Sequence, residues 1–250
     1  MGFINIPNLP NSKVSKLIAG QGVLPFADEL KKLNIDVLLS DTNDKISSSL
    51  KDHADLNVCY LGNGKLLLDS SQNTLCDRLK ELDFTADFIT ESVKEGYPSD
   101  CLLNAAITEK TAICNSGIIA EILNKHLIYN NYQIIETNQG YSKCSVCVVA
   151  DYAFITDDEN IYKALNKAKK DVLLVKKGSI ALNGFNYGFI GGCCGMIAKD
   201  IIAFCGDIKK HSDYNNIKSF ANNYGVSLQS LGNGELKDIG GLIPIYETEV

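Results

Sequence analysis

The sequence lacks any stretch that could cross a membrane, because none of its apolar runs approaches the roughly 18 residues of a spanning helix. The N-terminal stretch MGFINIPNLPNS is interrupted by prolines and has no long apolar run. We therefore expect no secretory signal, no membrane partner and a cytoplasmic protein.

Basic residues are too few for a general nucleic-acid surface. Lys and Arg number 24 against 30 Asp and Glu, and the net charge is -6. Such a chain has no general attraction for phosphate backbones, so we do not expect nucleic acid as a partner. The sequence leaves the oligomeric state open.

A complete metal-binding motif is also missing. The 9 cysteines are odd in number, irregularly spaced and mostly set in apolar runs, as expected of small buried residues in a reducing compartment. Cys144 and Cys147 have the spacing of a metal or redox pair, but no second pair completes a zinc set. We expect no metal and no cofactor.

What the sequence does contain is a repeat. Two apolar runs around a two-residue break occur four times, in NVCYLGNGKLLLDSS, LLNAAITEKTAICNSG, SVCVVADYAFITDDE and CGMIAKDIIAFCGDI. The copies recur at intervals of roughly 40 to 50 residues, a period typical of repeat architectures. The first break, Asn63-Gly64, is a strong hairpin signal. We predict four β-hairpins, with the other breaks at 109–110, 150–151 and 199–200.

A helix and a further strand follow each predicted hairpin. The predicted helix starts are Asn73 or Thr74, Ser116, Asp157 or Asp158, and Ser212 or Asp213. The predicted strands after them are ADFIT, YQIIET, DVLLVKK and VSLQSL. The repeating unit is therefore strand, strand, helix, strand.

A fifth unit is divided between the two ends of the chain. The N-terminal part supplies KLIAG, a helix and IDVLLS, and IGGLIPIYETEV at the other end supplies the missing first strand. We predict an α/β fold of one domain, 1–250, closed as a five-bladed ββαβ propeller with pseudo-fivefold symmetry. The expected units are 13–54 with 238–250, 55–99, 100–143, 144–191 and 192–237. An open doubly wound sheet fits less well, because it needs a helix between most successive strands.

In unit order, unit count and divided terminal unit, the chain resembles the pentein superfamily of guanidino-group-modifying enzymes. GFIGGCCG and IGGLIPI are similar to a bacterial branch of it. The resemblance implies attack by a cysteine thiolate on a guanidinium carbon, proton transfer by a histidine, and carboxylates that hold the cation. Deiminases, amidinotransferases and a factor that binds the large ribosomal subunit share this fold.

The chain departs from the pattern of those enzymes, which place the nucleophile after a glycine pair in the C-terminal strand. Here that strand reads GGLIPIYE, and no cysteine follows Cys205. The histidine-acid motif of the middle region is missing from NYGFIGG as well. If the protein is an enzyme, a hydrolase or amidinotransferase-like activity on C–N bonds would need a displaced nucleophile.

Candidate site residues come from hairpin geometry, because the first strand begins and the second ends at the same end of a hairpin. These positions should gather at one acidic mouth, to which Asp100, Cys101 and Cys144 also belong. The candidate catalytic residues are Cys193, Cys194 and His53. The candidate ligand-binding residues are Asp55, Asp69, Asn115, Asp157, Asp207 and Asp238. The alternative is that the acids and amides cap helices and that the cysteine pair packs in the core.

Two functions fit these observations. The first is binding, with or without modification, of a small cationic guanidino or amino compound in the acidic mouth. The second is a non-catalytic module that binds a protein or the ribosome, as in the ribosome-binding branch.

Overall fold

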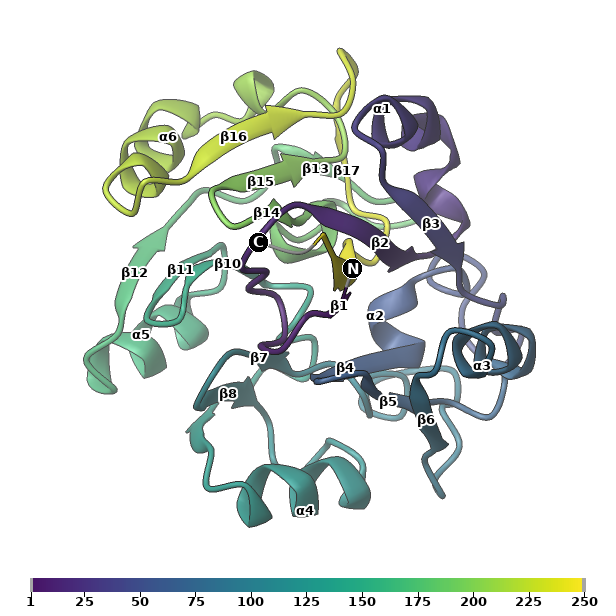
Figure 1. The fold of residues 1–250 in the computed structure, drawn as a ribbon. Coiled ribbons are helices and arrows are strands. Elements are labelled where there is room, and N and C mark those ends of the chain that lie inside the picture. The colour runs from purple at the N-terminus through teal and green to yellow at the C-terminus, as the bar shows by residue number, and fades with distance from the viewer. Residues whose placement is uncertain (1, 249–250) are drawn as a thin grey trace.

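Five small sheets form the framework of the structure, a computed structural model that describes residues 2–248 (Figure 1). Each sheet combines an antiparallel pair with a parallel pair, and a helix connects the two parallel strands. Figure 1 shows the sheets around the centre of the molecule and the main helices on its outside. Met1 and residues 249–250 of the predicted last segment lie outside the described residues.

The elements repeat in the predicted order, which confirms the strand, strand, helix, strand unit. The first strands are β4 (Val58–Gly62), β7 (Ala106–Ile107), β10 (Val146–Ala150), β14 (Cys194–Ala198) and β18 (Ile243–Glu247). The second strands are β5 (Lys65–Leu68), β8 (Thr111–Cys114), β11 (Ala153–Thr156), β15 (Ile201–Phe204) and β2 (Val14–Ala19). The helices are α3 (Asn73–Lys80), α4 (Glu121–Tyr129), α5 (Glu159–Lys167), α6 (Tyr214–Asn222) and α1 (Ala27–Lys32). The third strands are β6 (Thr85–Phe88), β9 (Gln133–Glu136), β12 (Asp171–Leu174), β16 (Ser227–Ser230) and β3 (Asp36–Leu39).

Short elements complete the described chain. They are β1 (Gly2–Phe3), α2 (Ala54–Asn57), the parallel pair β13 (Ile180–Ala181) and β17 (Leu236–Lys237), and the 3-10 turns η1 (Gln21–Phe26), η2 (Gly191–Cys193) and η3 (Ile208–Lys210).

The hairpin turns follow the predicted breaks with one exception. Asn63 and Gly64 have φ of 51° and 74°, the positive values that a tight two-residue hairpin turn needs. The break predicted at 150–151 is wrong by one residue, because Ala150 still pairs with Ala153 and the turn is Asp151-Tyr152.

Helix starts depend partly on residues far away in the chain. The Asp158 cap is confirmed, since its Oδ1 accepts from the amides of Asn160 and Ile161 at 2.8 and 3.0 Å. α3 is capped from outside, because Oδ2 of Asp41 accepts from the amides of Thr74 and Leu75.

The start predicted for the next helix at Ser116 is wrong. The chain turns at Asn115, whose carbonyl accepts from the amides of Ile118 and Ile119. α4 then begins at Glu121, and its amide donates to Oε1 of Glu91 at 2.7 Å. The carboxylate at this helix start therefore comes from a separate segment of the chain.

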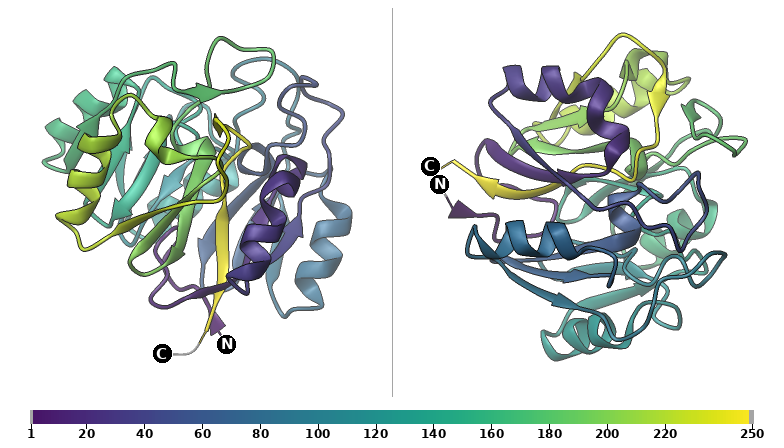
Figure 2. Two further views of the ribbon diagram at one scale, coloured as in Figure 1. Left: turned by 90° about the horizontal axis from the view of Figure 1, so that it is seen from above. Right: turned by 90° about the vertical axis from the view of Figure 1, so that its right-hand side faces the viewer.

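The divided unit is assembled as predicted, because β18 pairs with β2 in antiparallel register and β1 pairs with the other side of β18. Figure 2 shows both ends of the described chain close together at one end of the molecule. The five sheets stay separate in their hydrogen bonding, and the two-stranded β13–β17 pair forms a small sheet of its own. The fold is thus a mixed α/β arrangement of small sheets, not one continuous closed sheet.

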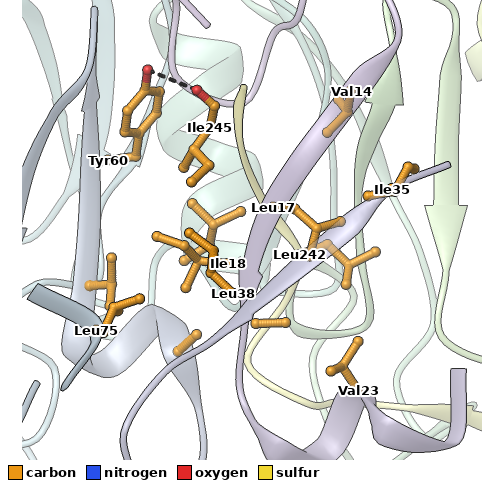
Figure 3. Packing of buried hydrophobic residues seen from close by; sticks show 14 of the residues in the cluster. Val14, Leu17, Ile18, Val23, Ile35, Leu38, Tyr60, Leu75, Leu242 and Ile245 are labelled. Atoms are coloured by element: carbon orange, nitrogen blue, oxygen red, sulfur yellow. Dashed lines mark hydrogen bonds between the residues drawn. The ribbon is translucent and has the colours of Figure 1, made fainter. Parts of the chain in front are cut away.

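The core around the β18–β2 pair is apolar (Figure 3). Leu17, Ile18, Leu242 and Ile245 are fully buried, and the hydroxyl of Tyr60 lies 3.4 Å from the carbonyl of Ile245. The segment 178–190 crosses the opposite end of the molecule from the termini (Figure 2). Among residues 2–248 no helix has the length and apolar character needed to cross a membrane.

The C-terminal strand should be essential for stability. Ile245→Ala removes a fully buried side chain from β18 and should lower the free energy of unfolding by about 2 to 5 kcal/mol. Ile128→Ala is the matched control, because Ile128 is 62% exposed. Urea unfolding followed by circular dichroism measures both, and equal small losses would contradict the role given to β18.

Candidate functional site

A cavity of about 270 Å³ lies where several first strands begin. Its polar residues are His53, Cys144, Asn186 and Asp238. Its remaining wall is apolar or aromatic and consists of Leu50, Leu56, Leu182, Tyr141, Phe185, Tyr187 and Phe189. His53, Cys144 and Asp238 precede the first strands of three different units, so the fold brings distant segments to one place.

Asp238 provides the buried charge of the cavity. Its carboxylate accepts from the amide of Phe189 at 2.9 Å and from the amide of Gly240 at 3.1 Å. Burial raises the pKa of Asp238, and the nearby Asp55 raises it further, while His53 opposes the shift. A cation placed in the cavity would favour the ionised carboxylate.

Glycines make the room for this carboxylate. A Cβ at Gly192 would lie 2.0 Å from Oδ1 of Asp238, and one at Gly188 would lie 2.5 Å from its Cβ. Any side chain at these positions would displace Asp238. Gly188 and Gly192 of GFIGG therefore make room for the acid that precedes β18.

His53 is buried beside Asp238, with 3.7 Å between its Nδ1 and Oδ1 of the acid. That distance exceeds a normal hydrogen bond, so the contact is an electrostatic one that requires a protonated ring. Gly240 has φ of 78° and packs against the backbone of His53, where a Cβ would lie 2.6 Å from its Cα.

Cys144 is the thiol that lines the cavity, and two residues outside the cavity wall, Asp55 and Asn104, form hydrogen bonds with it. Its Sγ–H donates to Oδ2 of Asp55 at 2.9 Å, and Nδ2 of Asn104 donates to Sγ at 3.2 Å. Oδ1 of Asn104 also accepts from the Cys144 amide at 3.2 Å. Burial, and next the charge of Asp55, raise the pKa of Cys144 well above its usual value. The side chain is thus a neutral thiol near pH 7.

Sequence reasoning placed Cys144 at the mouth but did not select it. The available signal was its position just before a first strand, shared with His53 and Asp238. Asn104 had no sequence signal, because its role depends on contacts with Asp55 and with the 143–144 backbone, remote in the chain.

Cys193 and Cys194 lie in the core and do not line the cavity. They are 0% and 3% exposed, and Sγ of Cys193 donates to the carbonyl of Ile190 at 3.2 Å. Burial raises the pKa of Cys193 well above its usual value, and the adjacent Cys194 adds to the shift. Their catalytic role stays a prediction.

Three of the other candidates lie in local turns. Asp69 accepts from the Ser71 amide, Asn115 from the Gly117 amide, and Asp207 from the Lys209 amide. Only the Asp207 contact caps a helical turn, η3, as the alternative interpretation has it, whereas the Asp69 and Asn115 contacts close turns that precede α3 and α4. None of the three lines the cavity, and Asp55 reaches it only through Cys144.

Asp157 lies in a separate, more open cavity with Lys176, Lys177 and Asp213. Its Oδ2 accepts from the Ile190 amide at 3.2 Å, and its buried Oδ1 has no partner. Within residues 2–248 no three His, Cys, Asp or Glu side chains are arranged to hold a metal ion.

The burial of Asp157 predicts a pH-dependent stability. Burial raises the pKa of Asp157 from 3.8 to about 7, so the folded state binds the proton more tightly than the unfolded state. Asp157 therefore makes the free energy of unfolding fall as pH rises from about 4 to about 7. Asp157→Asn mimics the protonated acid and should remove a fall on the order of 2 kcal/mol. Urea titrations across this range measure it, and Asp207→Asn is the control; the same slope in wild type and Asp157→Asn would refute the prediction.

The contact between Asp55 and Cys144 predicts that the Cys144 thiol reacts slowly with alkylating reagents. Asp55→Asn removes the charge that raises the pKa of Cys144, so iodoacetamide should alkylate this residue several-fold faster at about pH 8. Mass spectrometry of the Cys144 peptide gives the rate, and Cys144→Ser identifies the signal. Asp207→Asn should behave like wild type, and no acceleration in Asp55→Asn would show that Asp55 does not control the thiol.

Solved structures with this architecture include two amidinotransferases and a deiminase. SxtG, an amidinotransferase from the Microseira wollei saxitoxin biosynthetic pathway, superposes with a TM-score of 0.63 at 7% identity, over 99% of this chain and 98% of that chain. Inosamine-phosphate amidinotransferase StrB1 from Streptomyces griseus gives 0.62 at 10% identity, over 100% and 98%. C. jejuni agmatine deiminase with substrate bound gives 0.59 at 12% identity, over 99% and 97%.

These likenesses show that the chain has the pentein fold, as the sequence resemblance indicated. No curated protein sequence matches it. A family model described as "Family of unknown function (DUF6873)" matches residues 19–243. Since that match spans most of the sequence, the chain belongs to this family.

Proposed function

We propose that the protein binds a small cationic guanidino or amino compound in the cavity of His53, Cys144 and Asp238. The observation that carries the proposal is the Asp238 carboxylate, buried at a largely apolar cavity with its pKa raised. Within residues 2–248 its ion pairs include no lysine or arginine, and His53 is a countercharge only when it is protonated, so a ligand cation would supply a permanent one.

The proposal also includes the finer architecture. Five units around a pseudo-fivefold axis would direct the starts of their first strands to one end of the molecule. His53, Cys144 and Asp238 come from three such starts and share the cavity, which supports this arrangement. The 9 unpaired cysteines suit a reducing compartment, so we place the binding function in the cytoplasm.

A stricter form of the proposal adds turnover of a guanidino C–N bond, by hydrolysis or amidino transfer. Its support is the Cys144 thiol, 2.9 Å from a carboxylate that could accept its proton, with His53 in the same cavity. Cys144 fits this role better than Cys193 or Cys194, because it lines the cavity. Turnover would need the Cys144 thiolate, and the raised pKa of Cys144 keeps it protonated. A bound cation would have to lower that pKa before the thiol could attack.

The binding function can be tested with the full chain and a panel of cations. Isothermal titration with agmatine, arginine, methylated arginines, ethanolamine and choline should give saturable binding for at least one compound. Asp238→Asn should weaken that binding about tenfold or more, because the buried countercharge is lost.

Asp207→Asn is the matched control, since it makes the same change at a turn outside the cavity. Circular dichroism checks that both variants fold, and if Asp238→Asn does not, titration of the wild type with an uncharged analogue of the compound that binds shows whether the charge is recognised. Absence of binding by the whole panel would refute the proposal. An ammonia or urea assay on the same mixtures, with Cys144→Ser as control, separates turnover from binding alone.

A further inference from the structure

The aromatic side chains of the cavity form a wall from two segments of the chain. Tyr141 precedes β10, and Tyr187 and Phe189 belong to the segment before β14. The ring centroids of Tyr141 and Phe189 are 6.2 Å apart with planes at 31°, and those of Tyr187 and Phe189 are 6.3 Å apart with planes at 86°. Two of the rings thus meet nearly at right angles, and the third lies beside them.

This wall is held in place by polar contacts. The hydroxyl of Tyr141 donates to Oδ2 of the buried Asp100 at 2.7 Å, which orients its ring. The amide of Phe189 donates to Asp238, so the same segment carries an aromatic ring and fixes the carboxylate. Rings and charge therefore have a fixed relation to one another.

One of the rings already binds a cation within the protein. Nζ of Lys177 lies 5.4 Å from the centroid of Tyr187, the geometry of a cation–π contact. Lys177 does not line the cavity that Tyr187 lines. Tyr187 is therefore a cation acceptor at a border of the cavity.

Asp238 is the buried carboxylate that lines the cavity, and each of its oxygens already accepts one backbone amide, which leaves one lone pair on each for a ligand. The thiol of Cys144 donates to Asp55, which does not line the cavity. A guanidinium or a primary ammonium has several N–H donors, and each would need an acceptor once buried. A quaternary ammonium has none, and it is attracted by aromatic faces and by a carboxylate without hydrogen bonds.

We infer that the preferred ligand of this cavity is a small quaternary ammonium compound with a trimethylammonium head. This inference rests on the proposed cation site and narrows its ligand class. The head lies against Tyr141, Tyr187 and Phe189, with Asp238 as its countercharge. The volume of about 270 Å³ is at the small end for ligand sites, which suits a compound the size of choline.

Choline and ethanolamine test the inference, because they differ only in the three methyl groups on nitrogen. Isothermal titration of the full chain should show choline binding about tenfold or more tightly than ethanolamine. The neutral isostere 3,3-dimethylbutan-1-ol should also bind at least about tenfold more weakly than choline, because it lacks the charge.

Variants of Tyr187 test the aromatic contact. Tyr187→Leu should weaken choline binding about tenfold and change ethanolamine binding little, whereas Tyr187→Phe keeps the ring and the affinity. Tyr152→Leu is the control, because Tyr152 is 55% exposed and outside the cavity. Circular dichroism verifies folding of each variant, and the retained affinity of Tyr187→Phe separates loss of the ring from damage to the segment.

The outcomes distinguish this inference from the proposed function. If agmatine or ethanolamine binds as tightly as choline, the quaternary-ammonium inference is overturned, but the proposed cation site stands. If the neutral isostere binds as tightly as choline, the inference is overturned as well, and only a ligand-binding cavity remains. If Tyr187→Leu leaves choline binding unchanged, the aromatic contact is overturned. If no compound binds the wild type, the proposed function and the inference both fail.

Discussion

The cavity depends on the position of Asp238, which lies between β17 and β18 and is held by the strand pairs that these two strands form with β13 and β2. Residues 238–242 lead into β18. The register of β18 with β2 places them against Asp55 and η2. The amides of Ile239 and Gly241 both donate to the carbonyl of Gly192, which fixes this connection. On its other side Asp238 follows β17, and its amide donates to the carbonyl of Ala181 in β13 at 2.9 Å, so both pairings position its carboxylate.

The Gly191-Gly192 pair is the second constraint. A Cβ at Gly191 would lie 2.3 Å from the carbonyl oxygen of Lys143, and one at Gly192 would meet Asp238. Cys193 and Cys194 follow them into the core. The segment GFIGGCCG therefore contributes to the cavity through its glycines and its aromatic ring, while its thiols pack among apolar side chains.

The electrostatic state of the cavity follows from burial. Asp238 is removed from water beside an apolar wall, which raises its pKa, and Cys144 stays protonated next to Asp55. Both shifts would be relieved by a bound cation, because a positive charge favours the carboxylate and the thiolate alike. This response to positive charge is the electrostatic basis of the proposed binding function.

Local patterns in the sequence determined the repeating unit, the Asn63-Gly64 turn and the Asp158 cap, because these depend on residues adjacent in the chain. The divided unit was also predictable, since its two halves carry the same pattern as the complete units. The start of α3 at Asn73 was predicted, but not that Asp41 caps it, and the start of α4 at Glu121 was missed, because the carboxylates Asp41 and Glu91 come from remote segments.

The same distinction separates the site from its sequence signals. His53 and Asp238 were recognisable as residues that precede first strands, and both line the cavity. The choice of Cys144 over the cysteine pair required the tertiary structure, because strand order alone does not say which thiol reaches the cavity. Tyr141 and Phe189 lie far apart in the sequence, and packing alone makes them neighbours.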